Sequence, residues 1–151
     1  MVTATDGFEE RPSSGAGGLL RDPESDLRVG TCCSISDQIR LLWPLADNHI
    51  QRIECIAVLR MLVYHPDVFR GRDVRWFVDN TAVLGALVRG RSGDPVVHIM
   101  TELIHLLLFC LQCMVYFEWV ESDANWSDGM SRLMTQCPWA SATKVASKQR
   151  Q

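Results

Sequence analysis

The spacing of apolar residues changes along this chain from strand-like to helix-like at about His49, and this change limits the folds that the chain can adopt. Before that point, three segments carry strand signals: 2–5, the glycine-rich 15–21, and 27–35. Short turns join them, so we expect them to pair as an antiparallel meander. After it, helical and strand-like segments alternate, as they do in proteins with parallel strands.

The segments after His49 have clear boundaries. An apolar stripe through Ile53, Ala57 and Met61 predicts a helix that ends before Pro66. Further strands are expected at 74–78 and 114–120, and further helices at 82–88, at 95–112 and, as a short final helix, after 125. This order of elements predicts an α/β fold in which helices flank a mixed sheet.

The composition fits one globular domain, because 47% of the 151 residues are hydrophobic and 22% are charged. Beyond Pro138, the sequence is dominated by Ala, Ser, Thr, Lys and Gln, which is typical of a frayed or disordered end. We therefore expect a domain at 1–136 and a disordered tail at 137–151.

Charged residues interrupt the most apolar segment. This segment, 96–120, contains Glu102 and Glu118, so it is not expected to span a membrane. The first residues lack the basic start and the apolar core of a secretion signal. The sequence therefore predicts an intracellular protein of the cytoplasm or nucleus that has no membrane partner.

The formal net charge of −3 does not indicate general binding to nucleic acids, which usually requires an excess of basic residues. A nucleic-acid partner would have to be held by a local patch. Five arginines bracket one candidate region, although scattered arginines are more often typical of a solvated surface: Arg70, Arg72, Arg75, Arg89 and Arg91.

Four acidic residues lie where they can converge on one edge of such a sheet. Asp6 follows the first strand, and Asp79 lies where a strand gives way to a helix. Glu54 lies beside the apolar stripe of its helix, and Asp128 falls in the first turn of the last helix. Two of them also have simpler interpretations, Asp79 as a helix cap and Glu54 as a solvated side chain. Clustered carboxylates repel one another unless hard cations such as Mg²⁺ neutralise them, so convergence would indicate a metal site.

Two blocks of sequence resemble the ribonuclease H-like domain of retroelement reverse transcriptases. The first, 77–92, begins Phe-Val-Asp-Asn-Thr-Ala, and the second, 115–132, ends in the more specific pattern Asn125-x-x-Asp128-x-x-Ser131-Arg132. The helix around Glu54 is similar to the first helix of that family, and the glycines at 15–18 are similar to those of its second strand. The resemblance covers residues 2–134 in the order of the family.

The resemblance implies a five-stranded mixed sheet, with three antiparallel and two parallel strands, and hydrolysis of the RNA strand of RNA–DNA hybrids. It implies two Mg²⁺ ions, with Mn²⁺ as the alternative, about 3.5–4 Å apart. Asp6 would contact both ions, and Asp128 would hold one of them. Glu54 and Asp79 would share the other ion.

The resemblance also provides candidates for contacts with a substrate and a partner. Asn80 and the loop residues Arg89, Arg91 and Ser92 are expected to contact the backbone and the 2′-hydroxyl groups of the hybrid. Arg132 is expected to fix the last helix by pairing with a carboxylate, and Asn125 is a candidate cap for that helix. A reverse transcriptase domain in a parent polyprotein is the expected protein partner.

Two alternatives to this activity stay open. The first is a DNA-directed nuclease of the same fold, of the integrase, transposase or resolvase type, against which the Asn-x-x-Asp-x-x-Ser-Arg pattern argues. The second is a non-catalytic remnant that only binds nucleic acid, against which the intact set of four acids argues. One departure from the family is that the loop 121–125 lacks the histidine that many ribonucleases H carry there; this departure is compatible with slower turnover and does not imply inactivity.

Overall fold

A computed structural model describes residues 1–10, 13–43, 49–132 and 144–145 of the chain. The strands are β1 (Val2–Glu10), β2 (Ser13–Asp22), β3 (Leu27–Ser34), β4 (Asp73–Val78), β5 (Met114–Trp119) and β6 (Lys144–Val145). The helices are α1 (Asp37–Leu41), α2 (Ile50–Tyr64), α3 (Pro66–Phe69), α4 (Thr81–Arg89), α5 (Pro95–Leu111) and α6 (Asp128–Ser131), with a 3-10 turn, η1, at Ser122–Ala124.

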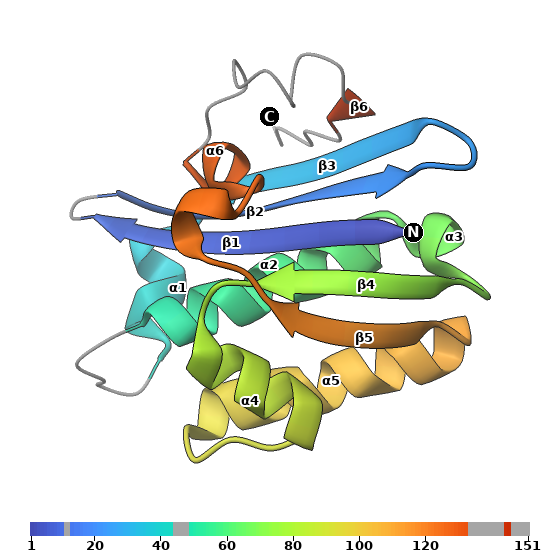
Figure 1. The fold of residues 1–151 in the computed structure, drawn as a ribbon. Coiled ribbons are helices and arrows are strands. Elements are labelled where there is room, and N and C mark those ends of the chain that lie inside the picture. Colours follow the sequence, from blue (N-terminus) through green and yellow to red (C-terminus); the bar gives the residue numbers. More distant parts are fainter. Residues whose placement is uncertain (11–12, 44–48, 133–143, 146–151) are drawn as a thin grey trace.

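The strands form one mixed sheet in the order β5-β4-β1-β2-β3, with the short β6 at the β3 edge (Figure 1). β1, β2 and β3 pair antiparallel, whereas β4 is parallel to both β1 and β5. The predicted α/β fold with a five-stranded mixed sheet is therefore confirmed. Most of the predicted tail at 137–151 lies outside the described residues, so the domain boundary at 136 stays a prediction.

β1 is longer than the sequence predicts. The first strand was predicted at 2–5 only, whereas residues 7–10 continue the ladder with β2, from Gly7 opposite Ala16 to Glu10 opposite Ser13. Pairing of this kind depends on the neighbouring strand, which local composition does not reveal. Asp6 consequently lies inside a strand rather than at the end of one.

The core lies between the sheet and the helices α2, α4 and α5. Its centre is Trp76 of β4, which is fully buried and stacks on Phe69 with ring centroids 5.3 Å apart. The indole Nε1 donates a hydrogen bond to Thr5 Oγ1 at 3.0 Å, which satisfies its buried polar atom. Trp76 thereby links β4 to β1 next to the segment that carries Asp6.

The longer helices have the ends that their sequences predict. Asp94 caps α5 by accepting hydrogen bonds from the backbone of Val96 and Val97, and Pro95 occupies its first position. Gly90 ends α4 in the left-handed region, with φ of 69°. The short helices α1 and α3 and the turn η1 were not predicted, because segments of three to five residues are too short to show a helical period.

The sheet is covered on both faces near β1. α2 lies on one face, and α6 packs against β1 and β2 on the other (Figure 1). A β-carbon at Gly7 would collide with the Ile53 side chain of α2, and a β-carbon at Gly17 would collide with the backbone of Met130 and Ser131. These two glycines therefore let α2 and α6 approach the sheet closely from opposite sides.

Within the described residues, no helix is long and apolar enough to cross a membrane.

Candidate metal centre

Asp6 and Asp79 occupy matching positions on two neighbouring parallel strands, Asp6 within β1 and Asp79 directly after β4. The pairing of β1 with β4 ends at Ala4 opposite Phe77, and each acid follows two residues later. Parallel strands bring their carboxyl ends to the same edge of a sheet, where ligand sites collect. Asp6 is buried, with 4% of its surface exposed, and Asp79 is half-buried.

Glu54 reaches the same place from α2. Its side chain is buried, with 3% exposure, so the interpretation of Glu54 as a solvated residue is wrong. The absence of a side chain at Gly7 lets the backbone around Glu54 lie against β1. One oxygen each from Asp6, Glu54 and Asp79 lies within 4.8 Å of the others. Three of the four predicted acids therefore form a cluster.

The cluster is electrostatically costly without a cation. Burial, reinforced by the charges of Asp6 and Asp79, raises the pKa of Glu54 well above its ordinary range. Burial also raises the pKa of Asp6 to about 6; the hydrogen bond from Ser131 opposes this rise, and the charges of Asp79 and Asp128 add to it. The cluster therefore favours the protonated forms of Asp6 and Glu54 unless a positive charge binds.

Two oxygens of the cluster point to what would fill it. Glu54 Oε2 and Asp79 Oδ1 are buried, and neither has a hydrogen-bond partner among the residues that the structure describes. Buried carboxylate oxygens without partners are rare in proteins, because their desolvation is not compensated. Mg²⁺ and Mn²⁺ prefer oxygen ligands of this kind. The donor set therefore fits a divalent cation.

Asp128 lies at the rim of the cluster. It falls in the first turn of α6, as predicted, and lines the same open pocket of about 330 Å³. Its carboxylate is paired with Arg132 at 2.9 Å, and Arg132 also pairs with Glu10 at 2.9 Å. The expectation that Arg132 pairs with a carboxylate is confirmed. The pocket is lined by Asp6, Gly7, Phe8, Glu9, Glu10, Ile50, Glu54, Asp79, Asn80, Ser122, Asp128 and Arg132.

Asn80 lies beside the cluster and caps α4. Its Oδ1 accepts hydrogen bonds from the backbone of Ala82 and Val83 at 3.0 and 3.2 Å. Asn80, and not Asp79, is therefore the helix cap, and the alternative interpretation of Asp79 as a cap is wrong. The carboxylate of Asp79 is therefore not used in capping α4 and can take part in the cluster.

The remaining predicted substrate contacts do not line the pocket. Arg89, Arg91 and Ser92 lie at or beyond the last residue of α4, whereas Asn80 precedes its first. A helix of nine residues separates them by about 13 Å. Two other arginines of the candidate basic region form ion pairs: Arg72 with Asp22 at 3.8 Å, and Arg75 with Glu118 at 3.7 Å.

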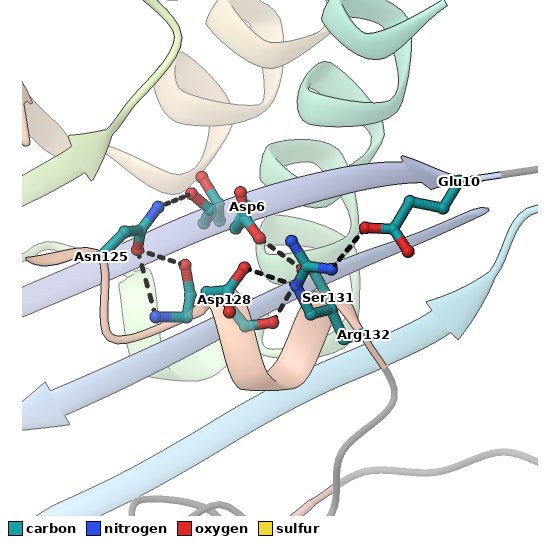
Figure 2. A network of polar contacts seen from close by, with 8 residues as sticks. Asp6, Glu10, Asn125, Asp128, Ser131 and Arg132 are labelled. Atoms are coloured by element: carbon teal, nitrogen blue, oxygen red, sulfur yellow. Dashed lines mark hydrogen bonds and ion pairs between the residues drawn. The ribbon is translucent and has the colours of Figure 1, made fainter. Parts of the chain in front are cut away.

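A buried network connects β1 with the segment that carries Asp128 (Figure 2). Asn125 donates through Nδ2 to the carbonyl oxygen of Thr5 at 3.1 Å, and its Oδ1 accepts from the amide and the hydroxyl of Ser127. Asn125 is therefore not the cap of α6 that was expected, since Ser127 occupies that position. Its amide bonds the strand instead, because the loop crosses β1 at this point.

Ser131 is a member of the network for which the sequence alone predicts no role. Its side chain is fully buried, and its hydroxyl donates a hydrogen bond to Asp6 Oδ2 (Figure 2). The only signal in the sequence is its position one helical turn after Asp128, within the pattern that also contains Arg132.

Comparison with known proteins identifies the fold. The sequence matches no protein-family model and no curated protein sequence. Among solved structures, RNase H1 of the halophilic archaeon Halobacterium salinarum matches with a TM-score of 0.65 at 14% identity, over 88% of this chain and 95% of that one. The N-terminal RNase H domain of a Mycobacterium tuberculosis protein matches with a TM-score of 0.65 at 12% identity, over 88% and 91% of the two chains.

A third similar structure is LC11 RNase H1 in complex with an RNA/DNA hybrid, with a TM-score of 0.57 at 10% identity, over 87% of this chain and 94% of that one. Identities this low describe the fold and not the chemistry. The chain thus has the ribonuclease H fold, and its activity has to be argued from its own residues.

Proposed function

We propose that this chain is a metal-dependent endonuclease that hydrolyses the RNA strand of RNA–DNA hybrids. The observation that carries the proposal is the pair of buried oxygens without partners, Glu54 Oε2 and Asp79 Oδ1, in a cluster with Asp6. Such a cluster is costly to fold and is typical of sites that hold divalent ions. Its place just beyond the point where the pairing of β1 with β4 ends, in an open pocket, leaves it accessible to a large substrate.

The three residues of the cluster and Asp128 would together bind two ions. Asp6, Glu54 and Asp79 are the proposed ligands of one ion, and Asp128, together with Asp6, of the other. When bound, a pair of such ions supplies an activated water and stabilises the leaving oxygen of a phosphodiester. Because Asp6 and Glu54 are buried, they would bind an ion in a medium of lower polarity than water, where the attraction is stronger.

The substrate assignment rests on the fold and on the pocket. One protein of the same fold has been solved with an RNA/DNA hybrid, and we extend that substrate class to this chain. Asn80 lies in the pocket, and its amide nitrogen is proposed to contact the backbone of the hybrid. A duplex extends well beyond the pocket, so its backbone outside the pocket would be contacted by Arg89, Arg91 and Ser92.

The wider context is also part of the proposal. The two sequence blocks that resemble retroelement reverse transcriptases support an origin in, or descent from, such an element. A reverse transcriptase domain of the parent polyprotein would then be the partner that helps a chain of net charge −3 to hold a polyanionic substrate.

The test is hydrolysis of hybrids labelled on either strand, in Mg²⁺ and in Mn²⁺, by the chain and by its Asp79→Asn variant. We expect cutting of the RNA strand, and a loss of at least about 100-fold in the variant, because losing an ion ligand removes several kcal/mol of transition-state stabilisation. Asp67→Asn, a change in an exposed aspartate of α3, is the matched control and should cut normally.

Three results would contradict the proposal. If Asp79→Asn cleaves as well as the wild type, the proposed metal site is not the catalytic site. Cleavage of duplex DNA but not of the hybrid would favour a DNA-directed nuclease of the same fold. Binding of nucleic acid without metal binding or strand cleavage would favour the non-catalytic remnant.

A further inference from the structure

Ser131 connects the two parts of the candidate metal centre, and we propose that it is a positioning residue that orients Asp6 and holds the turn carrying Asp128. This inference rests on the proposed metal-dependent function and adds to it a residue that contacts neither ion. It assigns a role to the one fully buried hydroxyl group that, among the described residues, reaches a carboxylate of the cluster.

The hydroxyl of Ser131 has two acceptors and one proton. Its Oγ donates to Asp6 Oδ2 and also lies 2.9 Å from the carbonyl oxygen of Asp128. A serine can donate only one hydrogen bond, and bonds to an ionised carboxylate are about twice as strong as bonds to a neutral carbonyl. The hydroxyl of Ser131 therefore donates its hydrogen bond to Asp6 when Asp6 is ionised. The bond occupies Oδ2 and leaves Oδ1 free to face an ion.

α6 depends on contacts of this kind for its position. It has only four residues, and no side chain caps its first turn. An isolated helix of that length is not stable in water. It is held instead by its approach to the sheet, where the backbone of Met130 and Ser131 lies against Gly17.

Asp128 lies between two buried anchors to β1 (Figure 2). Asn125, three residues before it, bonds the carbonyl oxygen of Thr5, and Ser131, three residues after it, bonds the carboxylate of Asp6. Thr5 and Asp6 are consecutive, so both anchors reach the same place on the strand. The bond from Ser131 thus fixes the rotation of Asp6 and the distance between Asp6 and Asp128 at once.

A second buried serine separates this role from ordinary packing. Ser14 is also on the sheet, with 3% exposure, and its hydroxyl donates to the carbonyl oxygen of Ile35 at 3.3 Å. It therefore resembles Ser131 in burial and in donating a hydrogen bond, but its acceptor is outside the carboxylate cluster. Ser14→Ala is the matched control for Ser131→Ala.

The test is calorimetric titration of the full chain with Mn²⁺, together with thermal unfolding in the absence of metal. We expect both alanine variants to unfold at somewhat lower temperatures than the wild type. Only Ser131→Ala should weaken the binding of Mn²⁺, by at least about tenfold in Kd, which is the usual effect of removing a hydrogen-bond partner of a metal ligand. Ser131→Cys replaces the hydroxyl by a slightly larger thiol, which is a weaker donor, and it should also weaken Mn²⁺ binding. This second variant tests the inference even if Ser131→Ala does not fold.

The outcomes distinguish this inference from the function on which it rests. If the wild type binds Mn²⁺ and every Ser131 variant that folds binds it with the same affinity, Ser131 is only a packing residue and the inference is wrong. If the wild type itself binds no Mn²⁺, the proposed function fails, and the positioning role fails with it. A loss of affinity in Ser14→Ala equal to that in Ser131→Ala would also overturn the inference.

Discussion

Arg132 holds Asp128 in an ion pair in which Nε and Oδ1 are 2.9 Å apart, while its Nη1 reaches Glu10 Oε1 at the same distance. Asp128 is thus already neutralised by a cation from its own helix end. Glu54 and Asp79 differ from Asp128, because each has a buried carboxyl oxygen with no hydrogen-bond partner in the described part of the chain. The two proposed ion sites are therefore expected to differ in affinity.

Replacing Arg132 should strengthen the weaker of these sites. In Arg132→Gln, Asp128 loses its competing cation, so the second Mn²⁺ ion should bind about two- to fivefold more tightly, as expected for an exposed ion pair. Titration calorimetry with Mn²⁺ measures both sites. Glu10→Gln is the control, because it leaves the pair with Asp128 intact and should not tighten binding. Weaker binding in Arg132→Gln would show that the arginine supports the site instead.

The stability of the metal-free protein should depend on pH through Asp6. Its pKa of about 6 in the folded chain lies above the ordinary value of 3.8, so the folded state prefers the protonated acid. That preference is fully present below about pH 4, is lost as the pH rises through about 6, and amounts to about 3 kcal/mol. Urea unfolding with a chelator at pH 4 to 7 should show a larger loss in the wild type than in Asp6→Asn, in which only Glu54, whose pKa is also raised, still contributes. An identical pH profile in the two proteins would refute it.

Glu54→Gln should have opposite effects with and without metal. Burial and the neighbouring charges disfavour the ionised form of Glu54 and raise its pKa, whereas glutamine has no ionised form, so the metal-free protein at pH 7 should become more stable. The same change removes an ion ligand. An excess of Mg²⁺ about 100-fold above Kd should stabilise the wild type by about 2.7 kcal/mol and the variant by much less.

The measurement for Glu54→Gln is thermal unfolding with chelator and with Mg²⁺, and Glu24→Gln, at an exposed position, is the control. A variant that is less stable without metal, or that is stabilised by Mg²⁺ as strongly as the wild type, would contradict the assignment of Glu54 to the metal centre.

Gly17→Ala should displace α6 from the sheet. The added β-carbon would collide with the backbone of Met130 and Ser131, which cannot move aside as a flexible side chain can. We expect a loss of about 1–3 kcal/mol in the free energy of unfolding and a decrease in hybrid cleavage. Urea unfolding and the cleavage assay measure the two effects. Gly93→Ala, where nothing lies within 4 Å of the added carbon, should have neither effect, and equal stability of the two variants would contradict the packing described for α6.

Elements with strong local signals could be predicted from the sequence. The boundaries of α5 follow from Asp94 and Pro95 at its start, and Gly90 marks the end of α4. β4 and β5 follow from dense runs of β-forming residues. Among the acids, Glu54 and Asp79 lie where these elements bring them, so the cluster could be expected once the order of elements was known.

Features that depend on residues distant in the sequence could not be predicted. The extension of β1 over residues 7–10 requires its partner β2, and the pairing of Arg132 with Glu10 joins the two ends of the fold. The hydrogen bond from Ser131 to Asp6 also joins two residues that are 125 positions apart in the sequence. A pattern of single residues shows which side chains are present, whereas these contacts depend on how segments distant in the sequence pack against one another.

The central claim is that Asp6, Glu54 and Asp79 together hold a divalent ion, and anomalous diffraction from crystals soaked in Mn²⁺ tests it most directly. The account predicts a strong anomalous peak among these three carboxyl groups at neutral pH, and its loss in Asp79→Asn. An empty cluster at saturating Mn²⁺, with its carboxyl groups protonated or bonded to one another, would contradict the account.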